Sequence, residues 1–218
     1  LKSDMMGTKA VYLEDWARVE GRAFLRFDYS GHGESSGSFA EGCIGDWHED
    51  TLAAVTALTE GPLIVVGSSM GGWQALLLAR QWPERIAGLI GIAAAPDFTE
   101  DGYWANFTEA QKQTLAEVGQ VELPSDYMEP YVITRRMIED GRKRLVLREA
   151  LDLPFPVRLL QGTADTAVST ATAVRLLEHA QSPDMQLTLV KDADHRFSDA
   201  RCLAMIVAAI NEVTGREG

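Results

Sequence analysis

Three residues of this chain have the types and the order that nucleophilic catalysis needs: Ser69, Asp165 and His195. Ser69 is the middle residue of segment 67–71 (GSSMG), which fits the G-x-S-x-G pattern of a serine exposed on a sharp strand-to-helix turn. A serine hydroxyl is a weak nucleophile, so a histidine must take its proton and a carboxylate must orient and stabilise that histidine. The order serine, acid, histidine is the one expected where this pattern occurs.

The residues around Ser69 supply the strand and the helix that such a turn requires. Segment 63–66 (LIVV) predicts a buried strand, and segment 73–80 (WQALLLAR) predicts a mostly apolar helix. We expect Gly67 and Gly71 because side chains two positions on either side of the nucleophile would collide with the neighbouring strand and helix. The alternatives are a plain Gly/Ser-rich turn or a phosphate-binding loop, but this stretch has neither G-x-x-x-x-G-K-S/T nor G-x-G-x-x-G.

Among the four histidines, His195 is the expected base. It lies in segment 192–197 (DADHRF), between the last predicted strand and the closing helix, where the base of such a site belongs. The alternative is a loop histidine without a role. His32 precedes Ser69 in the chain, which is the wrong order for the base and indicates a structural role. His48 and His179 fall inside predicted helices, at the surface or at the edge of the core.

Asp165 is the expected acid because it directly follows a predicted strand, segment 156–162. The alternative is a turn aspartate that accepts hydrogen bonds from its own backbone. Asp97, after the preceding predicted strand, is the second candidate. Asp192 and Asp194 are too close to the histidine in sequence to orient it easily, so we expect them to shape its loop.

Attack on a carbonyl creates an oxyanion, which needs N–H donors already in place. One donor is the backbone N–H of the residue after the nucleophile, here Met70, and the other comes from the loop after an earlier strand. That loop falls at the very start of this chain, so Leu1 is the candidate, and the first strands of the fold are expected to be missing. Removing one such donor typically costs ~10²–10³ in rate.

Alternating strands and helices predict an α/β fold, with a mostly parallel sheet covered by helices on both faces. The core is assigned to residues 1–96 and 154–218. Its further predicted strands are 23–29, 86–95 and 185–190, and its further predicted helices are 8–20, 42–60, 170–180 and one that Ser198 caps.

Segment 97–153 differs from the core because it has no strand-like apolar runs, and we expect an inserted helical lid with helices at 109–118 and 131–147. Its aromatic residues either line an acyl pocket or pack the lid onto the body, and the two are compatible. Six basic residues could steer an anionic leaving group, although a solvated helix face is the favoured reading. The aromatic residues are Tyr103, Trp104, Phe107, Tyr127 and Tyr131, and the basic residues are Arg135, Arg136, Arg142, Lys143, Arg144 and Arg148.

The composition is that of a globular protein, with 46% hydrophobic and 24% charged residues in 218 positions. The formal net charge of −12 disfavours nucleic acids and anionic membrane surfaces as partners. No apolar run reaches the ~18 residues of a membrane span.

Cys43 and Cys202 lack the spacing of a disulfide framework or a zinc site and are expected to be reduced and buried. No leader is recognised, which favours a cytoplasmic location, with a mitochondrial one as the alternative if a leader was removed.

Four segments carry a resemblance: 7–10 (GTKA), 26–31 (RFDYSG), 66–73 (VGSSMGGW) and 194–196 (DHR). With them the chain resembles the α/β hydrolases and, more narrowly, the serine hydrolase branch that includes a mitochondrial depalmitoylating thioesterase, also described as an acyl-glucuronide esterase. The resemblance implies Ser69 as nucleophile, Asp165 as acid and His195 as base. It also places Leu1 where the first oxyanion donor of that branch sits.

The function expected from these features is hydrolysis of carboxylic esters or thioesters through an acyl-enzyme, with a small-molecule acyl substrate and without a metal or organic cofactor. A monomer is the default state. One alternative is a cofactor-free haloperoxidase or acyltransferase, since the same three residues serve perhydrolysis and acyl transfer. The other is a ligand-binding protein that kept the fold and lost turnover.

Overall fold

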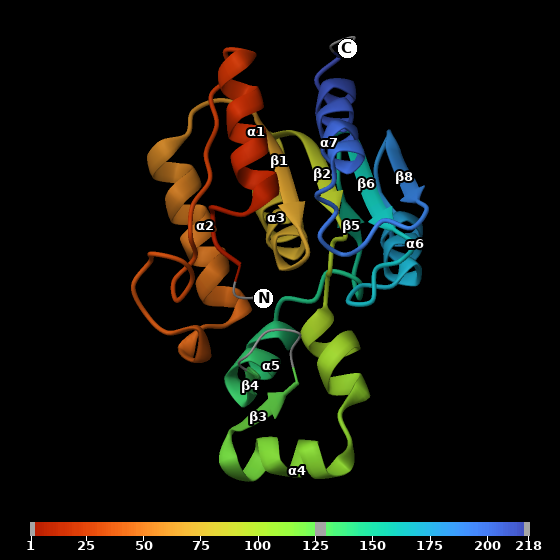
Figure 1. Cartoon of the computed structure of the whole chain (residues 1–218). Helices are drawn as coiled ribbons and strands as arrows, with labels where there is room; N and C mark the ends of the chain where they lie inside the picture. The colour runs from red at the N-terminus through yellow and green to blue at the C-terminus, as the bar shows by residue number, and fades with distance from the viewer. Residues whose placement is uncertain (1–2, 125–129, 216–218) are drawn as a thin grey trace.

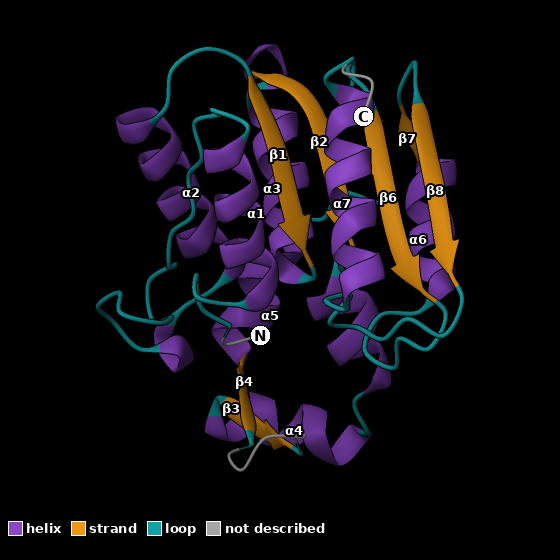
Figure 2. Ribbon diagram, turned by 45° about the horizontal axis from the view of Figure 1, so that its top comes forward, coloured by secondary structure: helices purple, strands orange, loops and turns teal. Residues whose placement is uncertain are grey.

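Four parallel strands form the central sheet of the computed structural model, which describes residues 3–124 and 130–215. They are β1 (Leu63–Ser68), β2 (Ile86–Ile92), β6 (Val157–Gly162) and β8 (Met185–Val190), paired in the order β1-β2-β6-β8. Figures 1 and 2 show the strands running side by side, with their carboxyl ends at the same edge. Residues that follow these strands therefore meet at one edge of the sheet.

Helices cover both faces of this sheet (Figures 1 and 2). α1 (Thr8–Val19) and α7 (Ala200–Val213) lie on one face, while α3 (Met70–Gln81) and α6 (Thr170–His179) lie on the other, with α2 (Ile44–Leu58) beside α3. Such helices return the chain to the starting edge of the sheet, which is why successive strands pair in parallel. The predicted α/β fold is confirmed.

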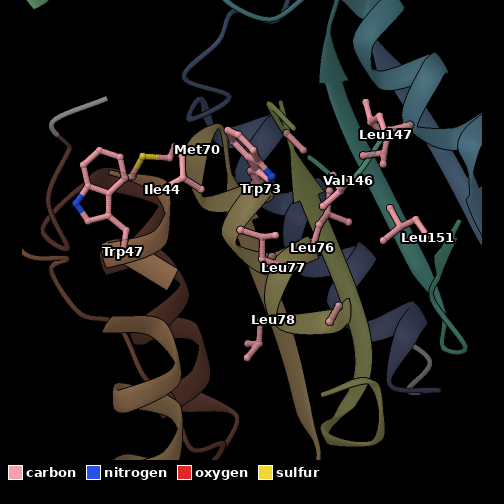
Figure 3. Packing of buried hydrophobic residues seen from close by; sticks show 14 of the residues in the cluster. Ile44, Trp47, Met70, Trp73, Leu76, Leu77, Leu78, Val146, Leu147 and Leu151 are labelled. Atoms are coloured by element: carbon pink, nitrogen blue, oxygen red, sulfur yellow. The ribbon is translucent and has the colours of Figure 1, made fainter. Parts of the chain in front are cut away.

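Residues along the strands alternate between two apolar clusters. Leu89 of β2 and Leu159 of β6 belong to the cluster with α3 and α6, whereas their neighbours Ile90 and Leu160 belong to the cluster under α1 and α7. A strand buried on both sides needs apolar residues at nearly every position, which explains the continuous apolar runs of the sequence. Figure 3 shows part of the first cluster, where α3 packs near Ile44 and Trp47.

Residues 98–123 and 131–142 form an inserted lobe beyond the carboxyl ends of the strands (Figure 1), and the chain then returns to the body, where residues 151–152 pair with residues 180–181. The expected helix at 109–118 is confirmed, but the one expected over 131–147 is confined to α5, and a β-hairpin precedes it. The elements are η3 (Phe98–Trp104, a π-helix), α4 (Glu109–Val118), β3 (Gln120–Leu123), β4 (Tyr131–Thr134), α5 (Arg135–Arg142) and the short β5 (Leu151–Asp152), which pairs with β7 (Ala180–Gln181).

The hairpin corrects the expectation of a helical insertion without strand-like runs. β3 and β4 pair antiparallel, with Val121 opposite Ile133, and both side chains are buried. Each strand has four residues, so the apolar alternation is too short to distinguish from a helical pattern. Thr134 then ends β4 and caps α5 by accepting a hydrogen bond from Met137 N–H at 3.1 Å.

Segment 23–29 is not a strand, contrary to the expectation from its apolar alternation. It is extended, but within the described residues it joins no strand ladder, and side chains hold it instead. The Asp28 carboxylate accepts hydrogen bonds from Met5 N–H (2.6 Å) and Glu34 N–H (3.1 Å), and Arg26 forms an ion pair with Glu14 at 2.7 Å. A run of strand-forming residues does not identify a pairing partner, which explains the error.

The end of β2 and the cap of α7 differ from expectation, whereas the state of the two cysteines agrees with it. The strand expected over 86–95 ends at Ile92, because Ala93 has a φ of 44° and turns the chain. Asp199, and not Ser198, caps α7, since its side chain accepts from the Cys202 N–H at 2.7 Å. The expectation for the cysteines is confirmed, because both are free and buried.

None of the described helices combines the length and apolar character that a bilayer crossing requires. The remaining short elements are η1 (Phe39–Glu41) and η2 (Pro83–Arg85).

Candidate active site

Ser69 stands on a strained turn between β1 and α3, as the G-x-S-x-G pattern predicts. Its φ is 55° and its ψ is −120°, a backbone conformation that residues with a side chain rarely adopt. The end of β2 holds this turn, because Ser69 N–H donates to the Ile92 carbonyl (2.9 Å) and Ala95 N–H donates to the Ser69 carbonyl (3.1 Å). The strain is thus maintained by hydrogen bonds to the neighbouring strand.

Close packing of the turn requires glycine at one of the two expected positions, Gly67, but not at the other, Gly71. A different position, Gly72, is constrained instead. A Cβ on Gly67 would lie 2.3 Å from the Gly71 carbonyl oxygen, so Gly67 is required as predicted. A Cβ on Gly71 would meet nothing within 4 Å, so the expectation for this position is wrong. Gly72 is the second constrained position, since its Cβ would lie 2.6 Å from Cβ of Ala94. The first turn of α3 presses on the chain that leaves β2, and that contact falls on Gly72.

The structure brings Ser69, His195 and Asp165 together at the carboxyl edge of the sheet. Ser69 Oγ lies 3.1 Å from His195 Nε2, and His195 Nδ1 lies 2.9 Å from Asp165 Oδ2. The serine follows β1, the aspartate follows β6 and the histidine follows β8. Both distances are within hydrogen-bond range, so a proton can pass from the hydroxyl to an imidazole that a carboxylate orients.

The Asp165 carboxylate is fully buried and accepts hydrogen bonds on both oxygens. Oδ1 accepts from Ala167 and Val168 N–H, each at 2.8 Å, and Oδ2 accepts from Gln161 Nε2 at 3.0 Å in addition to His195. Burial raises the pKa of Asp165, but the hydrogen bonds from Val168, His195 and Ala167 outweigh burial and lower the pKa overall. The carboxylate is therefore ionised beside the imidazole.

The loops that carry the acid and the histidine are bonded to each other. Ala164 N–H donates to the Ala193 carbonyl at 3.0 Å, and Asp192 N–H donates to Thr163 Oγ1 at 2.9 Å. Asp194 accepts from Phe197 N–H at 3.1 Å, so Asp192 and Asp194 shape the histidine loop, as expected. The relative position of the base and the acid is thus fixed by direct contacts between their loops.

Met70, the first expected oxyanion donor, is the first residue of α3. Its backbone N–H belongs to the first turn, where helical N–H groups have no acceptor within the helix. Its side chain is buried and points toward Ile44 and Trp47 (Figure 3). Leu1, the second expected donor, lies outside the described residues, as does Tyr127 of the expected aromatic set. The donor roles of Met70 and Leu1 remain predictions.

Asp97, the second candidate for the acid, instead joins the two ends of the inserted lobe. Its buried carboxylate accepts from Val146 N–H (2.8 Å), Leu147 N–H (3.0 Å) and Arg148 (3.2 Å). Burial raises the pKa of Asp97, against the effect of these donors. Asp97 therefore holds the returning chain against the exit from β2.

The other histidines have structural surroundings, as the sequence indicated. His32 is buried among the rings of Tyr29, Phe39 and Trp47, and burial lowers its pKa. His48 and His179 lie in α2 and at the end of α6. His48 Nε2 contacts Gln81 Oε1 at 2.8 Å, and His179 Nε2 contacts the Glu149 carbonyl at 2.7 Å.

Most of the basic residues of the inserted lobe are paired with carboxylates, which agrees with the favoured reading of an ordinary charged surface. A cavity of about 500 Å³ beside α5 is lined in part by Arg135, Arg136 and Lys143, and no residue of the serine, histidine and aspartate set lines it. No group of three or more potential metal ligands occurs within residues 3–124 and 130–215. The ion pairs are Arg136–Asp46 (2.6 Å), Arg142–Glu100 (2.6 Å), Arg144–Asp140 (2.7 Å), Arg148–Asp97 (3.2 Å), Arg148–Asp101 and the long Arg135–Glu139 (3.9 Å).

Aromatic rings pack the inserted lobe onto the body. Trp73 of α3 lies edge-on to Phe98 (5.4 Å between ring centres), Phe98 to Tyr103 (5.6 Å), and Tyr103 stacks on Phe107 at 6.3 Å. Trp73 Nε1 also donates to the Arg144 carbonyl at 3.1 Å. The packing role expected for the lobe aromatics is present, and an acyl-lining role remains a prediction.

Sequence reasoning missed Gln161, Gly72 and Thr163. Gln161 is buried in a strand, and its proximity to Asp165 could have been anticipated, because the two are separated by one tight turn. Gly72 was visible as part of a glycine pair, but only the packing distance distinguishes it from Gly71. Thr163 carries no sequence signal, because its role depends on which loop lies beside it.

Known proteins match this chain over most of its length. Residues 10–137 match the family model described as serine aminopeptidase, S33. The mitochondrial palmitoyl-protein thioesterase ABHD10 of Rattus norvegicus is 36% identical over 97% of this chain and 71% of its own. The structure of mouse α/β hydrolase domain-containing protein 10 has a TM-score of 0.90 and 35% identity, covering 99% of this chain and 86% of that chain.

A second solved structure is a protein of Agrobacterium vitis S4 described as a hydrolase. It has a TM-score of 0.94 and 40% identity, covering 98% of this chain and 84% of that chain. The family model ends at residue 137, after β1, whereas the two solved structures cover 98% and 99% of this chain. The chain therefore belongs to the α/β-hydrolase family of serine hydrolases, as a relative of the ABHD10 thioesterases, and is an enzyme that hydrolyses esters or thioesters.

Proposed function

We propose that Ser69 is the nucleophile, His195 the base and Asp165 the acid of this hydrolase. The continuous contact from Ser69 Oγ to His195 Nε2 (3.1 Å) and from His195 Nδ1 to Asp165 Oδ2 (2.9 Å) is the observation that supports the proposal. A serine that forms an acyl-enzyme is activated by a base and an orienting acid in this geometry.

The reaction proceeds in two halves. Ser69 Oγ attacks the acyl carbonyl while His195 Nε2 takes the hydroxyl proton, and Asp165 stabilises the imidazolium that forms. The Met70 N–H, with Leu1 N–H as the proposed second donor, stabilises the oxyanion. His195 then gives its proton to the leaving alcohol or thiol, and the acyl group stays on Ser69. Water repeats these steps on the acyl-enzyme and releases the carboxylic acid.

The substrate class follows from the relatives and from the inserted lobe. Because the ABHD10 proteins carry the name palmitoyl-protein thioesterase, we propose S-acyl proteins as one candidate substrate, with acyl glucuronides as the other. The inserted lobe lies beyond the carboxyl ends of the strands (Figure 1), which supports our assigning it the role of a lid. The contact between the buried Trp73 and the half-buried Phe98 joins that lid to α3, the helix that follows the nucleophile.

A panel of substrates tests the proposal. Wild type and Ser69→Ala are compared on p-nitrophenyl esters, acyl thioesters and acyl glucuronides, with Ser68→Ala as the matched control on the neighbouring serine. We expect Ser69→Ala to lose turnover on every substrate and Ser68→Ala to keep it. Adding peroxide or an alcohol as a competing acyl acceptor separates hydrolysis from perhydrolysis or acyl transfer. Turnover that persists in Ser69→Ala would show that another nucleophile is used.

The cellular location is also a proposal. The ABHD10 relatives carry a mitochondrial designation, which supports the mitochondrial alternative and gives no support to the cytoplasmic location expected from the sequence. Fractionation of cells that produce the protein decides between the two. Size-exclusion chromatography with light scattering tests the expected monomer.

A further inference from the structure

Gln161, the penultimate residue of β6, is completely buried beside the acid. Its amide nitrogen Nε2 lies 3.0 Å from Asp165 Oδ2, 3.0 Å from the Val168 carbonyl and 3.2 Å from the Gly162 carbonyl. Asp165 Oδ2 is the same oxygen that accepts from His195 Nδ1. One carboxylate oxygen is therefore held between the imidazole and the Gln161 amide.

The amide oxygen of Gln161 has no hydrogen-bond partner among the described residues, although it is buried. A buried acceptor without a partner destabilises a fold, and an apolar side chain of similar volume would avoid that cost. Rotating the amide by 180° would place its oxygen against three acceptors and is worse. The amide is therefore favoured at this position by its donor side, which faces Asp165.

We propose that Gln161 is a positioning residue, which fixes the direction of Asp165 Oδ2 and through it the orientation of His195. This inference rests on the proposed roles of Ser69, His195 and Asp165. The same amide also reaches the carbonyl of Val168, whose N–H donates to the other carboxylate oxygen at 2.8 Å. Gln161 thus restrains both the carboxylate and the turn that binds it.

Loss of this donor has a definite consequence for the imidazole. Asp165 then retains His195 as its one side-chain donor, and the remaining contacts are the backbone N–H groups of Ala167 and Val168. The carboxylate concentrates more negative charge toward the ring, which favours the protonated ring, and it rotates more freely. His195 faces this carboxylate and exchanges the proton with Ser69, so the change is expected in the pH dependence of the rate.

The test compares Gln161→Met with Gln74→Met. Gln74 is equally buried, donates to the Ile44 carbonyl at 3.0 Å and also has an unpartnered amide oxygen, but it touches none of the three proposed catalytic residues. Both variants remove a buried amide of the same size. Thermal unfolding, kcat, KM and the pH dependence of kcat/KM are measured on a p-nitrophenyl ester.

We expect Gln161→Met to lower kcat about 10- to 100-fold, by analogy with the loss of a hydrogen-bond partner that orients a metal ligand. KM should change little, and the acid limb of kcat/KM should move to higher pH. Gln74→Met should leave kcat and the profile unchanged. A Gln161→Met enzyme with the wild-type kcat and profile would overturn the positioning role.

A second variant keeps the test decisive where Gln161→Met does not fold. Gln161→Glu has the same shape, but its carboxyl donates only when protonated, so kcat should fall with rising pH while wild type holds its rate. A Glu variant that follows the wild-type profile contradicts the inference. Ser69→Ala in the same assay separates the two claims, because retained turnover there would refute the proposed nucleophile, whatever Gln161 does.

Discussion

Replacing Asp165 by asparagine is expected to remove most turnover while leaving the fold intact. The carboxylate accepts four hydrogen bonds, two on each oxygen, at 2.8 to 3.0 Å. Asparagine offers one amide oxygen. When that oxygen stays with the Ala167 and Val168 N–H groups, its NH₂ group faces Gln161 and His195.

The new amide donor changes the tautomer of the histidine. Nδ1 of His195 must then accept a hydrogen bond, so the ring proton resides on Nε2, and a protonated Nε2 cannot take the proton of Ser69. The same substitution in a serine protease costs about 10⁴ in kcat, equivalent to roughly 5.4 kcal/mol of barrier at about 1.36 kcal/mol per factor of ten. We expect a loss of that order here.

The assay is steady-state hydrolysis of a p-nitrophenyl ester, with circular dichroism to verify folding. Asp194→Asn is the matched control, since it removes a charge adjacent to His195 while an asparagine oxygen can still accept from Phe197 N–H. We expect this control to stay within a few-fold of wild type. An Asp165→Asn enzyme that keeps more than a tenth of the wild-type kcat would refute the assignment of the acid.

Three further outcomes follow from the geometry. Gly72→Ala is expected to destabilise by ~1–3 kcal/mol through overpacking, whereas Gly71→Ala, whose methyl group meets open space, should be neutral or stabilising; urea denaturation measures both. The pKa of Asp165 is lowered in the folded state, so its stabilisation is complete above the unfolded value of about 3.9 and is lost as the pH falls through the folded pKa. The unfolding free energies of wild type and Asp165→Asn should therefore converge as the pH falls through the folded pKa of Asp165. Charge reversal at Arg142 and Arg144, both ion-paired, should raise KM equally for anionic and neutral esters, and an effect on anionic esters alone would restore the steering role.

The sheet and its chemistry could be predicted because they depend on local patterns. Continuous apolar runs marked the strands, and the residues after β1, β6 and β8 necessarily meet at one edge of a parallel sheet. Ser69, Asp165 and His195 follow those strands, so their proximity needed no knowledge of side-chain packing. The helical spacing of apolar residues likewise predicted the two long amphipathic helices α2 and α7.

The errors concern features that depend on distant neighbours. Segment 23–29 has the pattern of a strand, but pairing requires a neighbouring strand that the pattern does not identify. The hairpin of β3 and β4 has too few residues for a periodic signal. Whether Gly71 or Gly72 is constrained depends on Ala94, which lies on the chain leaving another strand. Each of these features is fixed by tertiary contacts.

The most direct measurement of the central claim is covalent labelling with a serine-reactive fluorophosphonate, followed by peptide mapping. We expect one label per chain, on Ser69, with labelling abolished in Ser69→Ala and retained in Ser68→Ala. Labelling should be slowed in His195→Ala, because the hydroxyl then loses the base at 3.1 Å. A label on another residue, or a label that survives Ser69→Ala, would contradict the account.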